Sequence, residues 1–277
     1  MSTPVAQSFP RQLRLALVMN GGVSLAVWMS GVTHELNNCR LEAQVACKAT
    51  SSRSAWAEIL RAANTTVTID LIAGASAGGL NGTVLAKAIA RHEDLPDMLC
   101  LWLERATISA EKLLAIDPEP ADSILNGRYF FDQVRELLEG STPCGQSPSE
   151  TPTVSLLVTA TALPIPDQDE QAGEVVSDSR RVYQFVARPG VPADTDGIAD
   201  LPEVPAQNDF DTAAKIETLA RAARASAGFP TAFQPVRDRA NRWANRLVYG
   251  ARATPYEVLA RFGDRVGETY ASEDVLP

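Results

Sequence analysis

Short runs of apolar residues alternate along the chain with stretches of mixed polarity. Four of these runs are rich in aliphatic and β-branched residues, which is typical of strands; they cover residues 13–19, 67–73, 154–160 and 181–187. The last two runs are separated by an acidic, polar insertion over residues 164–180 and should pair as neighbours. We predict that all four strands lie in one sheet that is mostly parallel.

Helical patterns occupy the stretches between and after these strands. They cover residues 25–39, 54–63, 80–91, 96–105, 129–139 and 212–225. Strands that alternate with helices indicate an α/β fold, with a mostly parallel sheet flanked by helices. Loops rich in proline, glycine and polar residues are expected over residues 140–152 and 189–208. We place one domain in residues 1–236 and an arginine-rich helical tail in residues 237–277.

The composition narrows the range of functions. Of the 277 residues, 45% are hydrophobic and 21% are charged, so the chain can bury a sizeable core. The net charge of −9 argues against nucleic acid as a partner and against electrostatic docking on an anionic membrane. A lipid substrate would be reached by transient apolar contact or as single molecules.

The cysteines and the N-terminus indicate the compartment. The four cysteines form no C-x-x-C pair, and two histidines cannot complete a zinc cluster around them. We therefore expect reduced thiols and neither a metal nor a cofactor. The N-terminus lacks the pattern of a secretory signal, and the apolar stretch over residues 13–32 is interrupted by Arg14 and Asn20. A soluble, cytoplasmic protein is expected, and its oligomeric state stays open.

A G-x-S-x-G pattern lies between a predicted strand and a predicted helix, and it consists of Gly74, Ala75, Ser76, Ala77 and Gly78. Small residues on both sides of the serine allow a sharp turn that raises its hydroxyl above the sheet, as in a nucleophile elbow. The backbone N–H of Ala77 would then face a developing oxyanion, aided by the helix dipole. The alternative is a glycine-rich turn that binds phosphate.

The two histidines do not fit the order of a Ser-His-Asp hydrolase, in which the histidine follows the serine near the end of the domain. His34 precedes Ser76, and His92 lies just after the helix that follows it. If Ser76 is a nucleophile, we therefore expect a carboxylate to act as its base.

Three motifs occur in the order found in the patatin-like phospholipases. They are Asn20-Gly21-Gly22 after the first predicted strand, the G-A-S-A-G-G segment over residues 74–79, and the A-S-A-G-F-P segment over residues 225–230. The chain resembles this family over residues 13–236. The resemblance implies a three-layer sandwich that hydrolyses lipid esters through a serine nucleophile. It also implies that backbone N–H groups of Gly21 and Gly22 contribute to the oxyanion hole.

The glycine loop departs from the family pattern. Val23, Leu25 and Ala26 stand where the family has a glycine, a basic residue and a further glycine. Backbone donors do not depend on these side chains, but Leu25 removes a cation that could favour a charged phospholipid head.

The base aspartate is the second departure. The resemblance implies an aspartate in a D-G-G or D-G-A motif, but none follows Pro230. Asp196-Gly197 comes earlier, in a segment typical of a solvated turn. Asp238 and Asp264 lie later, within arginine-rich helical sequence.

These observations favour a lipid acyl hydrolase whose chain is an N-terminal piece of a longer protein. A catalytically inactive scaffold or regulatory member is the alternative. A phosphate-binding α/β domain is weakened because neither glycine loop contains lysine. We predict that Gly21 and Gly22 lie within about 5 Å of the Ser76 hydroxyl. We also predict that no carboxylate of the chain lies within about 3.2 Å of it, the reach of a direct general base.

Overall fold

The computed structural model describes most of the predicted domain. The described residues are 11–46, 54–96, 98, 114, 123–140, 152–161, 180–190, 205–229, 232–234 and 236. The tail predicted over residues 237–277 and most of the helix predicted over residues 96–105 lie outside them. The domain boundary after residue 236 therefore stays a prediction.

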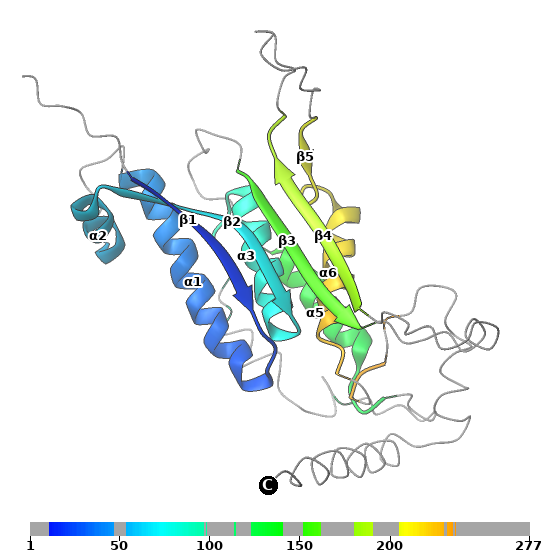
Figure 1. Cartoon of the computed structure of the whole chain (residues 1–277). Helices are drawn as coiled ribbons and strands as arrows, with labels where there is room; N and C mark the ends of the chain where they lie inside the picture. The colour runs from blue at the N-terminus through cyan, green and yellow to red at the C-terminus, as the bar shows by residue number, and fades with distance from the viewer. Residues whose placement is uncertain are drawn as a thin grey trace, which may run out of the picture.

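A five-stranded sheet forms the centre of the fold (Figure 1). Its strands follow chain order: β1 (Arg11–Met19), β2 (Thr65–Ala75), β3 (Val154–Thr161), β4 (Arg180–Arg188) and β5 (Gln207–Asn208). The prediction that four strands share one sheet is confirmed, and β3 and β4 pair as neighbours. The short β5 was not predicted and lies at the end of the segment assigned to a loop.

The sheet is mixed. β1, β2 and β3 run in the same direction, whereas β4 is antiparallel to β3 and β5 is antiparallel to β4. The carboxyl ends of β1, β2 and β3 therefore meet at one edge of the sheet, which is where α/β proteins usually place their sites.

The helices of the described segments are α1 (Val23–Ala46), α2 (Ala55–Ala63), α3 (Ala77–Arg91), α5 (Gly127–Glu139) and α6 (Ala213–Ser226). Five predicted helices are thus confirmed, and α1 continues beyond its predicted end at residue 39. Ser54, Asn126 and Thr212 define where α2, α5 and α6 begin, because each side chain accepts a hydrogen bond from the first helical turn.

α3 is the central helix of the core. All its residues from Ala77 to Ala90 are buried, and it packs against β2 and β3 with α1 and α6 as neighbours. Small residues allow this close approach: a methyl group on Gly82 would lie 2.9 Å from Cγ2 of Ile72 in β2. The position of the N-terminus of α3 is therefore fixed by contacts on several sides.

The described helices pack on one face of the sheet. Ile72, Leu156 and Val158 are buried on this face, whereas Val18 is 79% exposed on the other. The α/β fold is confirmed, and the second helical layer implied by the resemblance stays a prediction. Among the helices described, none combines the length and apolar character needed to cross a membrane.

Cys39 belongs to a small satellite core between α1 and α2. It is buried and forms no disulfide, and burial raises the pKa of its thiol. This environment agrees with a reduced core cysteine.

Candidate active site

Two of the sequence motifs meet at the carboxyl edge of the sheet. Met19 pairs with Gly74 at the end of β1 and β2. Gly21 and Gly22 then lead into α1, and Ser76 leads into α3, so that both helices begin at this edge (Figure 1). Each helix N-terminus carries about half a positive elementary charge. The edge is therefore suited to stabilising a developing negative charge.

Ser76 has a strained backbone, with φ of 52° and ψ of −118°. In the described part of the chain, Asn64 and His92 also have positive φ, but both adopt the left-handed conformation that commonly ends a helix. The Ser76 conformation normally requires glycine and costs about 1–3 kcal/mol, so it persists only where surrounding contacts hold it. It forms the sharp strand-to-helix turn that the G-x-S-x-G pattern predicts.

The glycines on either side of Ser76 are required by close backbone contacts. A methyl group on Gly74 would lie 2.4 Å from the carbonyl oxygen of Gly78. A methyl group on Gly78 would lie 2.1 Å from the carbonyl oxygen of Met19. The first turn of α3 therefore touches the ends of both β1 and β2, and a larger residue at either glycine would separate them.

Gly21 lies directly beside the serine. A methyl group on Gly21 would lie 2.9 Å from Cβ and 3.6 Å from Oγ of Ser76, so Gly21 lies about where it was expected. Gly22 has φ of 144°, which favours glycine, and a methyl group on it would lie 2.9 Å from Cδ1 of Leu25 in α1. The role of Gly21, Gly22 and Ala77 as oxyanion donors stays a prediction.

Ser226, at the end of α6, was not predicted to have a role. Its Oγ accepts a hydrogen bond from the backbone N–H of Ser76 at 2.7 Å and donates to the carbonyl oxygen of Thr159 at 2.6 Å. The only sequence signal was its place in the A-S-A-G-F-P segment, which indicates a motif but not a contact.

Asn81 of α3 was also missed. It is 1% exposed, and its amide donates to the carbonyl oxygens of Ala26 in α1 and Ala77 in its own helix. Asn81 therefore connects the first turns of α1 and α3, the two helices that follow Gly22 and Ser76. A polar residue within the apolar α3 pattern was the available signal.

The histidines lie away from Ser76. His92 caps the opposite end of α3, which at 1.5 Å per residue is about 24 Å from Ser76. His34 lies on the exposed side of α1, about three turns after the helix begins. Neither is placed to act as a base for Ser76, as expected.

No base for Ser76 is assigned. Within the described residues, Ser76 Oγ makes no hydrogen bond to a carboxylate, and no three ligating side chains form a metal site. Asp196, Asp238 and Asp264 lie outside the described residues. The prediction about the distance of these aspartates from Ser76 is therefore untested.

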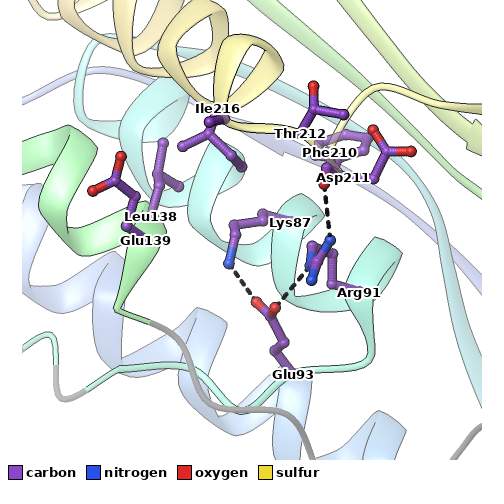
Figure 2. A pocket seen from close by; sticks show the side chains of 10 residues that line it. Lys87, Arg91, Glu93, Leu138, Glu139, Phe210, Asp211, Thr212 and Ile216 are labelled. Atoms are coloured by element: carbon purple, nitrogen blue, oxygen red, sulfur yellow. Dashed lines mark hydrogen bonds and ion pairs between the residues drawn. The ribbon is translucent and has the colours of Figure 1, made fainter.

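A pocket of about 290 Å³ lies near the other end of α3 (Figure 2). Glu93 is nearly buried there and forms ion pairs with Lys87 and Arg91. Arg91 also donates to the carbonyl oxygen of Asp211. The pocket is distinct from the Ser76 site because it lies at the opposite end of α3. Its carboxylate, Glu93, is already paired with two cations.

Comparison with known proteins agrees with this arrangement. The model of the family described as "Patatin-like phospholipase" matches residues 17–244. An uncharacterized membrane protein of Mycobacterium tuberculosis (strain ATCC 25618 / H37Rv) is 30% identical over 247 residues. The match covers 81% of this chain but 21% of the relative, so the chain spans about a fifth of that protein. No solved structure matches. The chain belongs to the patatin-like phospholipase family.

Proposed function

We propose that this chain hydrolyses lipid esters with Ser76 as the nucleophile. The family is one of lipid acyl hydrolases, which supports the reaction class. The observation that carries the assignment of Ser76 is its strained turn beside Gly21, at the N-termini of two helices.

In the proposed reaction, Ser76 Oγ attacks the carbonyl carbon of the ester while a base takes the hydroxyl proton. The carbonyl oxygen becomes an oxyanion, which the backbone N–H groups of Gly21, Gly22 and Ala77 stabilise. The oxyanion collapses, the bond to the alcohol breaks, and the alcohol leaves with a proton. Water then attacks the acyl-enzyme and releases the fatty acid. The base is taken to be a carboxylate, as the resemblance implies.

The exposed side of α1 supports access to a lipid. Leu25, Trp28 and Val32 are exposed and recur at helical spacing on one side of the helix, directly after the glycine pair. No charged residue occurs between Gly21 and Thr33. A tryptophan that is 66% exposed in such surroundings suits the polar–apolar boundary of a lipid aggregate. We therefore propose transient contact with the substrate surface at this site.

A fluorophosphonate probe tests the nucleophile, because it phosphonylates activated serines. We expect labelling of the 277-residue chain that is lost in Ser76→Ala and retained in the control Ser155→Ala. Ser155 lies in β3, on the face of the sheet away from α3. A folded wild-type chain that neither labels nor hydrolyses p-nitrophenyl esters would instead agree with the inactive scaffold, or with the prediction that no carboxylate of this chain reaches Ser76. A phosphate-binding loop likewise gives no reason for labelling.

A cytoplasmic location remains part of the proposal.

A further inference from the structure

The side chain of Ser226 forms a hydrogen bond with the backbone of Ser76, the proposed nucleophile. The C=O of Ser76 accepts the first helical hydrogen bond of α3, from Leu80 at 2.9 Å. The N–H of Ser76 donates to Oγ of Ser226, which lies 150 positions later in the chain. Both backbone polar groups of a residue in a strained conformation are therefore satisfied, one locally and one only through α6.

The hydroxyl of Ser226 is held in one orientation. It donates its proton to the carbonyl oxygen of Thr159 and so presents a lone pair to the N–H of Ser76. Ala75 and Thr159 are the last partners in the pairing of β2 with β3. The Ser226 hydroxyl therefore bridges the two strands at the point where their own pairing stops.

Packing also fixes the position of Ser226. A methyl group on Gly79 would lie 2.8 Å from Ser226 Oγ, so the hydroxyl rests against the first turn of α3 where no side chain intervenes. The hydroxyl is thus confined between the strand ends and the helix that carries Ser76 at its start.

The end of α6 is anchored by Arg224. Its guanidinium donates to the carbonyl oxygens of Gly127 and Gln234 and lies 4.5 Å from the ring centre of Phe233. Burial lowers the pKa of Arg224 to about 10. These contacts attach the last turn of α6 to the start of α5, so that Ser226 is presented by a fixed element.

We propose that Ser226 is a positioning residue, which holds the Ser76 peptide in its strained conformation and thereby aims Ser76 Oγ at the Gly21 side of the site. This inference rests on the proposed function of Ser76. Since the Ser76 N–H is already bonded to Ser226, the oxyanion donors are left to Gly21, Gly22 and Ala77. Ser226 itself touches neither substrate nor the reacting atoms.

The test compares Ser226→Ala with Ser226→Thr, which keeps the hydroxyl, and with Thr218→Ala. Thr218 lies on the exposed side of α6 and bonds only within that helix, to the carbonyl oxygen of Ala214. With a short-chain ester, we expect Ser226→Ala to lower kcat about tenfold to a hundredfold with little change in KM, because a displacement of about 1 Å can cost about a hundredfold. Ser226→Thr should recover most of kcat, and Thr218→Ala should match the wild type.

Hydrogen exchange of the Ser76 amide provides a readout that needs no catalysis. We expect exchange to be about tenfold faster or more in Ser226→Ala than in the wild type, since one hydrogen bond of about 1.4 kcal/mol is removed. Unchanged exchange, or a variant that raises KM at constant kcat, would overturn the inference. If the wild type hydrolyses no ester, the proposed function fails, and the exchange rate of Ser76 then decides the role of Ser226. Thermal denaturation shows whether each variant is folded.

Discussion

Replacement of Gly78 by alanine should separate two backbones that the fold brings into contact. The new methyl group would lie 2.1 Å from the carbonyl oxygen of Met19 and 2.5 Å from its carbonyl carbon. Even close contacts between carbon and a carbonyl oxygen are about 3.3–3.6 Å. The two segments must therefore move apart by more than about 1 Å. Met19 is held by pairing with Gly74, and α3 is buried over most of its length, so neither segment moves freely.

The loss of stability can be estimated from what the new methyl group would contact. Overpacking in a core costs about 1–3 kcal/mol, and a rigid backbone obstacle places Gly78→Ala at about 3 kcal/mol. In a domain of this size, each kcal/mol lowers Tm by about 2–4 °C, so we expect Tm to fall by about 6–12 °C. The same displacement moves Ser76 away from Gly21, so labelling by the fluorophosphonate probe should also slow.

Gly31→Ala is the matched control. Gly31 is exposed in α1, and a methyl group there would meet no neighbouring heavy atom within 4 Å. Alanine within a helix is favoured over glycine by about 0.5–1 kcal/mol, so this variant should be slightly more stable than the wild type. Denaturation of all three proteins followed by circular dichroism measures both effects. If Gly78→Ala is as stable as Gly31→Ala, the contact between α3 and the end of β1 is wrong.

Two further predictions concern the exposed side of α1 and the ion pairs near the end of α3. Trp28→Ala should lower hydrolysis of a lipid ester presented in vesicles but not of a soluble short-chain ester. The control is Ile59→Ala, because Ile59 is an exposed residue of α2, and this variant should change neither rate. Equal losses on both substrates would count against surface contact. Glu93→Gln should destabilise the protein by about 3–5 kcal/mol, because Lys87 would then be buried without its carboxylate. Urea denaturation measures this loss, and a loss below about 1 kcal/mol would show that the cation finds solvent or another partner.

The local sequence patterns predicted most of the elements that form the site. The β-branched run that becomes β2, the small residues around Ser76 and the helical spacing after it are all short-range signals, and the turn forms where they place it. The direction of β4 was harder to predict, because alternation along a strand carries no information about its orientation in the sheet. The two-residue β5 is too short to give a pattern.

Contacts between distant segments account for the features that the sequence did not predict. Ser226 reaches Ser76 across 150 positions, and Asn81 reaches Ala26 across 55. Ser226 has no local signature, because a hydroxyl within a helix looks the same whether it bonds to its own helix or to another segment. Thr218 and Ser226 illustrate this, since both are hydroxyl residues of α6 but only Ser226 bonds outside the helix. Asn81 is a polar residue in an apolar helix, but this signal does not identify the segment to which it bonds.

The topology of the sheet distinguishes between the aspartates considered as a base. Asp196 belongs to the connection between β4 and β5, and the paired ends of these strands, Arg188 and Gln207, lie at the edge opposite the Ser76 site (Figure 1). A nine-residue strand separates the two edges by about 30 Å. Thr161 and Arg180, in contrast, pair at the edge near Ser76, so the acidic insertion begins and ends there.

The end of α6 also lies at the edge of the sheet near Ser76. Ser226 lies against Ser76, so the chain leaves α6 at the edge that carries the site. Asp238 and Asp264 follow this point in the sequence, as do any residues of a longer protein. A carboxylate acting on Ser76 must lie within hydrogen-bond reach of its hydroxyl, directly or through one water molecule. Among the aspartates considered, topology therefore disfavours Asp196 as the base, because its connection leaves the sheet at the opposite edge, whereas the acidic insertion and the chain after Ser226 adjoin described residues at the Ser76 edge.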